Sequence, residues 1–431
     1  MIVHRLSALL AIGLALAAGH VMAAQGLSPE APFAVMAIPA DARAQLNPVV
    51  AWDGKGTYLV VWQQGRFYHQ GQHADILAAR VDSSGRVLDR EPIVICSVEA
   101  SQEQPQVAYS AGRFLVAWHD LRNGRDWDVY AARLTPAGKV LEPDGVLIAG
   151  GRQNQASPVL SPAADGFLVV WQHYDRHYQL QAAKLPAAGA PTANRAQPLR
   201  FRGEALWGGG LALTQVGSGW LLSWNDEKAW TMSGGASTST RHFARLAVHN
   251  GQVGVQEVQR APTVHIGRSG GQFASDGEST ALYAGWGSMG RGKKTATGAF
   301  FGAQRAAALR NPNPEQPGRG SAWNTDQMMT LYGVGVPIDG PVAIAFGQGG
   351  YLAAAREAYS GKPSDRNRLL GSRLTAAGMR IDASPWPVLH ESPHRLGNPA
   401  LAGGDRQFLL AFEQEDAAGR RQIWVKILKA E

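Results

Sequence analysis

Histidine and tyrosine side chains gather in the segments that follow a recurring aromatic position of the chain. Six of the twelve histidines lie there, with arginine, tryptophan and aspartate close by. An imidazole or phenol beside a guanidinium can abstract a proton from a uronate-like sugar and bind its carboxylate, and aromatic rings stack on flat ligands. We therefore expect a ligand site made of Arg66, Tyr68, His69, His73, His119, Asp120, Asp126, Trp127, His173, Tyr174, Asp175, His177, Asp226 and Trp230.

A structural role competes with this interpretation. His119 and Asp120 follow Trp118 directly, and a polar pair recurs at the corresponding positions. These pairs are Gln63-Gln64, Gln172-His173, Asn225-Asp226 and Glu413-Gln414. Recurrence favours hydrogen bonding of a strand end over catalysis. Histidines in exposed connections are otherwise ordinary surface groups.

Two short segments contain candidate metal ligands. His69 and His73 are four residues apart, a ligand spacing that works on a helix, but their glycine-containing segment does not predict one. His173, Asp175 and His177 could chelate within one loop. Neither spacing matches a closed nitrogen and sulfur site, so the sequence requires no metal and no other cofactor.

Familiar catalytic signatures do not occur in the sequence. It has no Gly-x-Ser-x-Gly elbow and no His-Glu-x-x-His motif. Cys96 is the only cysteine, so no intramolecular disulfide can form, and its place at the end of a predicted outer strand predicts a buried or half-buried thiol. Residues 275–278 are only loosely similar to a sialidase Asp-box, because no aromatic residue follows at that motif's spacing.

The elements that would position these residues are internal repeats. An apolar run, a glycine-containing turn and a second apolar run end on an aromatic anchor, which predicts a two-stranded hairpin. Seven copies occur, at residues 48–62, 105–118, 158–171, 211–224, 272–286, 341–355 and 399–412. The sixth copy ends on Ala355 in place of the anchor. The spacing of the copies fits propeller blades of about 50 residues with loop insertions.

A third and a fourth strand complete each predicted repeat. Residues 75–81, 128–134, 179–185 and 369–374 form the third strands, and a glycine follows the basic residue of each by five positions. Both faces of a strand such as 58–62 are apolar, as expected for a sheet between two neighbours. The sequence therefore predicts an all-β fold, a seven-bladed β-propeller of four-stranded blades, with the histidine-bearing segments on one rim.

The N-terminal part of the chain supplies the missing last strand. The final repeat stops one strand short after Leu428, whereas residues 33–38 precede the first repeat just as an outer strand precedes every later one. We expect residues 31–40 to complete the last blade and close the ring, which removes the exposed sheet edges.

The repeat unit resembles that of a broad group of proteins. Pro-x-Val-Ala, then Gly-x-Phe-Leu-Val-x-Trp, then Asp-Ile/Val-x-Ala-Ala-Arg is similar to the repeat of exported bacterial seven-bladed β-propeller proteins, most of them without assigned function. The resemblance covers nearly all of residues 33–431 and implies the fold. It implies little about activity, because propellers carry binding modules, lyases, hydrolases and scaffolds alike.

Composition and the chain ends set the remaining expectations. Residues 1–24 have a basic start, a short apolar core and small residues at the end, which is typical of a secretory signal peptide and predicts a periplasmic or secreted protein. Residues 25–431 would then form a single domain, with a long insertion at 306–340 that serves as a lid or a decoration. No segment predicts a transmembrane span. The formal net charge of +7 is scattered, and no motif indicates nucleic acid binding.

The sequence is compatible with two functions. The first is a noncatalytic, monomeric binding propeller that presents its rim to a glycan, a small ligand or a protein. The alternative is a carbohydrate-active enzyme, a polysaccharide lyase or glycosidase, that uses histidine, tyrosine and arginine of the same rim. The two differ in whether the side chains converge on one substrate proton.

Overall fold

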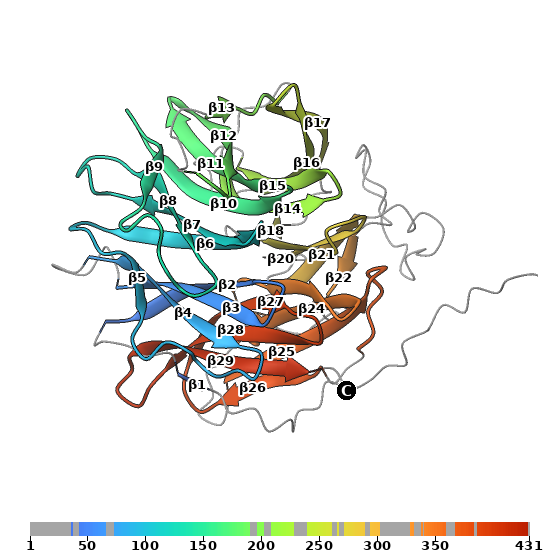
Figure 1. Cartoon of the computed structure of the whole chain (residues 1–431). Coiled ribbons are helices and arrows are strands. Elements are labelled where there is room, and N and C mark those ends of the chain that lie inside the picture. The colour runs from blue at the N-terminus through green and yellow to red at the C-terminus, as the bar shows by residue number, and fades with distance from the viewer. Residues whose placement is uncertain are drawn as a thin grey trace, which may run out of the picture.

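The computed structural model describes most of the repeat region. The described residues are 36–37, 43–65, 73–189, 196–201, 208–227, 239–260, 265–266, 271–288, 294–301, 328–331, 338, 340–358, 367–382 and 386–429. Within them all regular structure is β-strand, arranged in antiparallel sheets that lie side by side (Figure 1). Among these residues no helix is long and apolar enough to cross a membrane.

Four strands in chain order make up each of the first four sheets. The first sheet is β2 (Gln45–Trp52), β3 (Thr57–Gln64), β4 (Asp75–Asp82) and β5 (Ile93–Cys96). The second is β6 (Gln102–Ser110), β7 (Arg113–Asp120), β8 (Asp128–Leu134) and β9 (Val146–Ala149). The third is β10 (Gln155–Ala163), β11 (Gly166–Asp175), β12 (His177–Pro186) and β13 (Gln197–Pro198). The fourth is β14 (Gly208–Val216), β15 (Gly219–Glu227), β16 (Ser239–His249) and β17 (Gln252–Arg260).

The remaining sheets keep the same order with two variations. In the fifth, β18 (His265–Ile266) and β19 (Gln272–Ser275) both pair with β20 (Ala281–Ser288), which is followed by β21 (Lys294–Phe301) and β22 (Met328–Thr330). The sixth is β23 (Ala343–Gly347), β24 (Gly350–Arg356), β25 (Asn367–Thr375) and β26 (Val388–Ser392). The seventh is β27 (Leu396–Gly403), β28 (Gln407–Glu415), β29 (Arg421–Lys429) and β1 (Met36–Ala37).

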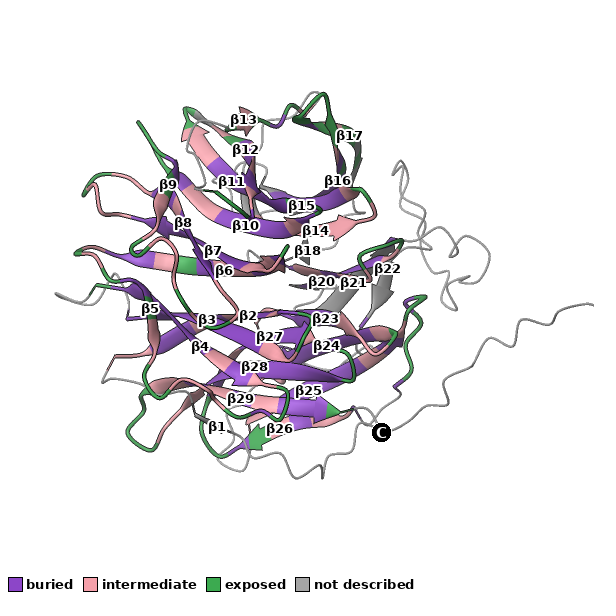
Figure 2. Cartoon of the chain, viewed as in Figure 1, coloured by how far each residue is buried: buried purple, intermediate pink, exposed green. Residues whose placement is uncertain are grey.

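The core lies between the sheets. Leu59 and Val61 of β3 pack against Phe114 of the second sheet, whereas the alternate residues of β3 pack against the seventh sheet. Because side chains alternate between the two faces of a strand, an uninterrupted apolar strand fills two interfaces at once. Figure 2 accordingly shows the second strands β3, β7, β11 and β28 as mostly buried. The expectation of apolar faces on both sides of the second strand is confirmed.

First strands of neighbouring sheets lie next to one another toward the middle of the molecule, and fourth strands such as β5, β9 and β26 lie at its periphery (Figure 1). Contacts run from β2 to β6, on to β10, β14, β19, β23 and β27, and from β27 to β2. The first strands are therefore the elements that bring polar side chains of different sheets together.

The N-terminal strand pairs with the end of the chain. Met36 lies opposite Val425, and Ala37 lies opposite Trp424, so β1 is the outer strand beside β29. The rest of the expected strand over 33–38 lies outside the described residues. Close to this pairing, the buried side chain of Gln45 accepts a hydrogen bond of 2.7 Å from the backbone N–H of Ile423.

Several residues expected in rim loops lie on strands. His119 and Asp120 pair with Val129 and Asp128 on the next strand. The β11–β12 hairpin continues through Asp175 and His177, so its tip turns at Arg176, whose φ is 61°. Placing these residues in loops was wrong, because polar residues at the end of a strand carry no local signal that distinguishes them from a loop.

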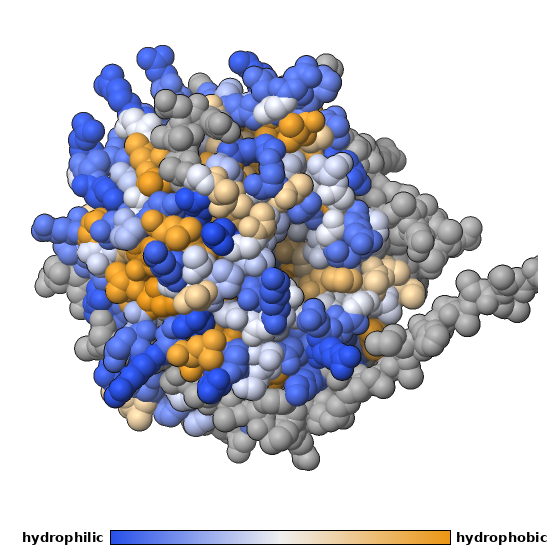
Figure 3. Space-filling model, in the orientation of Figure 1, coloured by the Kyte–Doolittle hydropathy of each residue, from blue (hydrophilic) through white to orange (hydrophobic). Residues whose placement is uncertain are grey.

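The long insertion contributes one strand to the described structure. Met328 and Met329 belong to β22, which pairs with β21 of the fifth sheet. Residues 302–327 lie outside the described part of the chain. On the face drawn in Figure 3, apolar residues form separate patches with hydrophilic residues between them.

Candidate functional site

The candidate site begins with a kink in the first strands. β2, β6 and β10 each shift register against their second strands, between Leu46 and Val49 in β2 and at the corresponding places in β6 and β10. A left-handed residue stands at each shift: Asn47 with φ 53°, Gln104 with φ 52° and Ser157 with φ 51°. Such a bulge removes one backbone N–H from the ladder and turns it toward a new partner.

Each freed N–H donates to the preceding sheet. The N–H of Asn47 donates to Oε1 of Glu413 at 2.9 Å, and that of Gln104 donates to Oε1 of Gln63 at 3.4 Å. The acceptors are the residues directly after the anchors Trp62 and Phe412. The hypothesis that the polar residue after the anchor hydrogen-bonds a strand end agrees with this geometry, and the bonded strand belongs to the neighbouring sheet.

His119 occupies the same position in the second sheet. Its Nδ1 lies 3.3 Å from the backbone N of Ser157, and its ring centroid lies 4.3 Å from that of Trp127. Burial lowers the pKa of His119 to about 4, with the nearby Asp120 carboxylate acting in the opposite direction. The imidazole is therefore neutral near pH 7. Because Nδ1 accepts a hydrogen bond, the proton is assigned to Nε2, which is buried and has no hydrogen-bond partner.

His173 reaches the same tautomer by another route. The indole N–H of Trp171 can only donate, and it donates to Oε1 of Gln155 at 3.1 Å. This orients the Gln155 amide so that its Nε2 faces Nδ1 of His173 at 2.6 Å. Nδ1 of His173 must then be the acceptor, and its proton is assigned to Nε2.

The two histidines therefore lie on either side of β10. His119 bonds to Ser157 and His173 bonds to Gln155, two positions apart on that strand. Tyr174, next to His173, lies with its ring centroid 4.9 Å from that of Tyr178. The arrangement supplies imidazole N–H donors and aromatic rings, and it leaves neither Nδ1 free to accept a proton.

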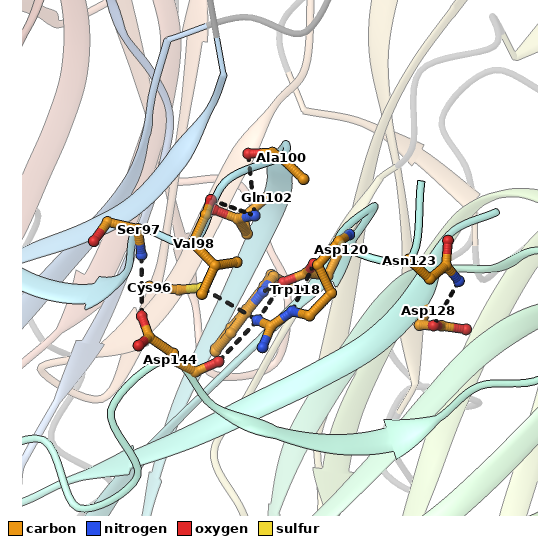
Figure 4. Close-up of polar contacts among 11 residues, drawn as sticks. Cys96, Ser97, Val98, Ala100, Gln102, Trp118, Asp120, Asn123, Asp128 and Asp144 are labelled. Carbon is orange, nitrogen blue, oxygen red and sulfur yellow. Dashed lines mark hydrogen bonds and ion pairs between the residues drawn. The ribbon is translucent and has the colours of Figure 1, made fainter. Parts of the chain in front are cut away.

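Asp120 serves the fold in this structure (Figure 4). It is fully buried, accepts from the indole of Trp118 at 2.9 Å and forms an ion pair of 2.6 Å with Arg122. The same guanidinium lies 3.3 Å from the sulfur of Cys96 and stacks over the ring of Tyr130. Burial raises the pKa of Cys96 to about 12, so the thiol is protonated. The expectation of a buried Cys96 is confirmed.

Asp126 is likewise engaged in local structure. Its carboxylate accepts from the side chain of Asn123 at 2.7 Å and from the backbone N–H of Gln153 at 3.0 Å. These bonds hold the β7–β8 connection against the residues that precede β10. Asp120 and Asp126 are thus structural carboxylates in this geometry.

The other expected site residues are placed as follows. His73 is exposed just before β4, Asp175 is exposed at the tip of the β11–β12 hairpin, and His177 and Asp226 lie on β12 and β15. Arg66, Tyr68, His69 and Trp230 lie outside the described residues. Across the part of the chain that the structure describes, no group of three or more His, Cys, Asp and Glu side chains is arranged to hold a metal ion.

Sequence reasoning missed a repeated ion pair. Arg80 binds Asp89 at 2.7 Å and Arg373 binds Asp382 at 2.6 Å, and Arg133 binds Glu142 in the same way. In each pair the acid follows the third-strand arginine by nine residues, a spacing that is visible in the sequence. Gln155 and Ser157 were also missed, because strand pairing identifies His173 as the partner of Gln155, and the packing of two sheets identifies His119 as the partner of Ser157.

Comparisons with known proteins concern the fold. A protein of unknown function from Dyadobacter fermentans aligns with a TM-score of 0.51 at 13% identity, over 92% of this chain and 98% of that chain. The polysaccharide lyase Uly1 aligns with a TM-score of 0.53 at 10% identity, over 92% of each chain. The chain has a β-propeller fold. The β-propeller domain of the Trilobed protease from Pyrococcus furiosus aligns more loosely, with a TM-score of 0.46 at 8% identity over 89% of this chain and 95% of that chain.

No protein-family model and no curated protein matches the chain. At the identities above, the likeness of this propeller to solved structures extends to the fold alone. Any binding or catalytic chemistry of this propeller depends on its own side chains.

Proposed function

We propose that this chain is an exported, noncatalytic, seven-bladed β-propeller that binds a glycan, a small ligand or a protein on the rim carrying His119 and His173. Residues 1–24 act as the signal peptide, and residues 25–431 form one domain. The rim of the first four blades presents the imidazole of His173, the rings of Tyr174 and Tyr178, and the indole of Trp127, with His119 buried beside Trp127.

The ring closes through the N-terminal strand in this proposal. The contacts among first strands return from β27 to β2, and β1 adds to the outer edge of β29. Gln45 and Glu413 add hydrogen bonds across the same junction. Closure in this way leaves no blade with an unpacked face, which is why a ring of apolar blades needs no polar caps.

The observation that carries the binding role is the state of the two histidines. A general base must offer a free lone pair within hydrogen-bond reach of the proton it removes. In His119 and His173 the lone pair of Nδ1 is engaged by Ser157 and Gln155, and Nε2 carries the proton. The Nε2–H of His173, which is half-buried, can donate to a ligand's hydroxyl, carbonyl or carboxylate oxygen, which is recognition chemistry, whereas that of His119 is buried.

The alternative remains a polysaccharide lyase or a glycosidase acting on the same rim. An enzyme would have to take its base from another group on this face. The exposed His73 is a described residue that fits this requirement.

The two functions separate in one assay. The purified protein is screened against acidic and neutral polysaccharides, recording both binding and the absorbance of unsaturated products. We expect binding without product for the wild type, and about tenfold weaker binding for His173→Phe, which removes the N–H donor. His249→Phe, at an exposed position on β16, is the control and should bind normally. Product formation would establish the enzyme, and silence on both readouts would favour a protein ligand.

A further inference from the structure

Six arginines of the described chain bind a carboxylate with the same edge of the guanidinium group, whereas Arg43 and Arg421 use Nη1. Nε and Nη2 lie side by side on that edge and match the two oxygens of a carboxylate. The described residues contain six such pairs: Arg80–Asp89, Arg122–Asp120, Arg133–Glu142, Arg368–Glu357, Arg373–Asp382 and Arg420–Asp416. Nε and Nη2 together therefore form a recurrent carboxylate-binding edge in the described chain.

Arg241 has the same edge buried and empty. It lies on β16 with 1% of its surface exposed. Its Nη1 donates to the carbonyl of Gly210 at 2.6 Å and lies 3.3 Å from Oγ of Ser223. Nε and Nη2 are also buried, and neither has a hydrogen-bond partner. No carboxylate of the described chain forms an ion pair with this guanidinium.

An unpaired cation in this position is costly. The guanidinium keeps its proton under all ordinary conditions, and an uncompensated buried charge destabilises a fold strongly. Burial lowers the pKa of Arg241, and the nearby Tyr283 opposes that shift only in part. The Tyr283 ring centroid lies 5.1 Å from Cζ of Arg241, which supports the cation through its π face without satisfying the two N–H groups.

The surroundings add an unmatched acceptor. Asn225 on β15 lies opposite Arg241 in the strand register, and its buried Oδ1 has no hydrogen-bond partner. Unpartnered donors and an unpartnered acceptor therefore occur at facing positions of the fourth sheet, beside Tyr283 of the fifth. A ligand with both a carboxylate and a hydroxyl group would satisfy both.

We propose that Arg241 binds the carboxylate of a small hydroxy acid or acidic sugar, held between the fourth and fifth sheets. Nε and Nη2 donate to the two carboxylate oxygens, and Oδ1 of Asn225 accepts from a hydroxyl group of the same ligand. Because these atoms lie out of solvent, side chains at this junction shift to admit the ligand. The site is separate from the histidines that flank β10 and stands whether or not they bind a glycan.

The test measures thermal stability and binding heat of the whole protein with sodium glucuronate, at ionic strength held constant with sodium chloride. Glucose serves as the neutral match, acetate as the carboxylate without hydroxyls, and sulfate and phosphate as other oxyanions. Glucuronate should raise the melting temperature in a saturable way, and glucose should leave it unchanged. Acetate should act more weakly than glucuronate.

Variants assign the effect to the residue. Arg241→Met should weaken glucuronate binding by about 10- to 100-fold, because it removes charged hydrogen bonds. Arg245→Met, an exposed position on the same strand, should bind as the wild type does. If Arg241→Met does not fold, Arg241→Lys replaces it as the test. Lysine keeps the charge but lacks the paired Nε and Nη2 donors, so this variant should still weaken binding.

Three results would overturn the proposal. They are a wild type that does not respond to glucuronate or acetate, a folded Arg241 variant that responds as the wild type does, and equal responses to sulfate, phosphate and glucuronate. The last would mark an adventitious anion site with no preference for carboxylates.

Discussion

The backbone N–H of Asn47 donates a hydrogen bond of 2.9 Å to Oε1 of Glu413, although 366 residues separate the two in the chain. Glu413 is 1% exposed, and its other oxygen lies 3.2 Å from Arg421. A buried carboxylate thus links the first strand of the first sheet to the second strand of the last.

Replacing Glu413 should weaken the junction. Glu413→Ala leaves the Asn47 N–H without its acceptor and should lower the free energy of unfolding by about 2–4 kcal/mol. Glu413→Gln keeps an oxygen acceptor and should cost less. Urea denaturation measures both, with Glu91→Ala, at an exposed position outside the junction, as the control. If Glu413→Ala were as stable as the wild type, the hydrogen bond between Asn47 and Glu413 would contribute nothing to the stability of the protein.

Deleting residues 31–40 should open the outer edge of β29. The lost pairing of β1 should cost about 1–3 kcal/mol and leave an unpaired strand that invites association. Urea denaturation and light scattering measure the two effects. Deletion of residues 25–30 leaves β1 in place and should change neither quantity. A deletion of 31–40 as stable and monodisperse as the wild type contradicts closure by this strand.

Stability should depend on pH through His119. Its folded pKa of about 4 lies below the ordinary value of 6.5, so the unfolded chain binds more protons between these limits. The contribution of His119 to stability is complete above about pH 6.5 and falls by about 3 kcal/mol as the pH drops to 4. His119→Gln, which places at this position the residue found at Gln63, should lose this contribution when urea denaturation is compared with the wild type at each pH. His249→Gln, at an exposed position, should keep it.

The buried ion pair of the third strand should matter more than an exposed one. Asp382→Asn leaves Arg373, which is 17% exposed, without a charged partner and should cost about 2–4 kcal/mol. Arg86→Ala breaks a pair with Asp82 in which the arginine is 71% exposed, and should cost less than about 0.5 kcal/mol. Urea denaturation of both variants measures the two losses in unfolding free energy. A loss for Arg86→Ala as large as that for Asp382→Asn would contradict the prediction.

Cys96 should resist thiol reagents while the protein is folded. Its raised pKa of about 12 keeps the sulfur protonated, and its side chain is fully buried. A disulfide reagent at pH 8 should therefore modify the native protein far more slowly than protein in urea, in which one equivalent reacts. Fast modification of the native protein would show that β5 readily separates from the second sheet, against which Cys96 packs.

The repeats were predictable because local patterns specify them. The apolar runs, the glycine turn and the anchor located the hairpin of β6 and β7 within three residues, and they located the third strand β8 at its observed bounds. The uninterrupted apolar run in the middle of β3 also predicted that both faces of this strand would be buried, because successive side chains point to opposite faces. The extra strand length at His119 was not predictable, because polar residues occur at strand ends and in loops alike.

The site was predictable only as a collection of residue types. The acceptor of the Ser157 N–H is a histidine 38 residues earlier, and the packing of the second sheet against the third brings the two together. Asp120 and Asp126 had the right chemistry for a ligand site, yet nearby donors occupy them. No feature of the sequence distinguishes Arg241, because an arginine is unusual only when it is buried and lacks a partner, and neither property can be read from the sequence.

The repeating strands follow from the sequence, because hydrophobic patterns and turn residues act over a few neighbouring positions. The pairing of the terminal strand with β29 follows from the repeat count, since the last repeat lacks one strand. Which polar groups are engaged and which are left open depends on the tertiary structure. Hydrogen bonding and desolvation depend on atoms that meet across sheets, as at Asn47 and Glu413, and those meetings are not encoded in any short stretch of the chain.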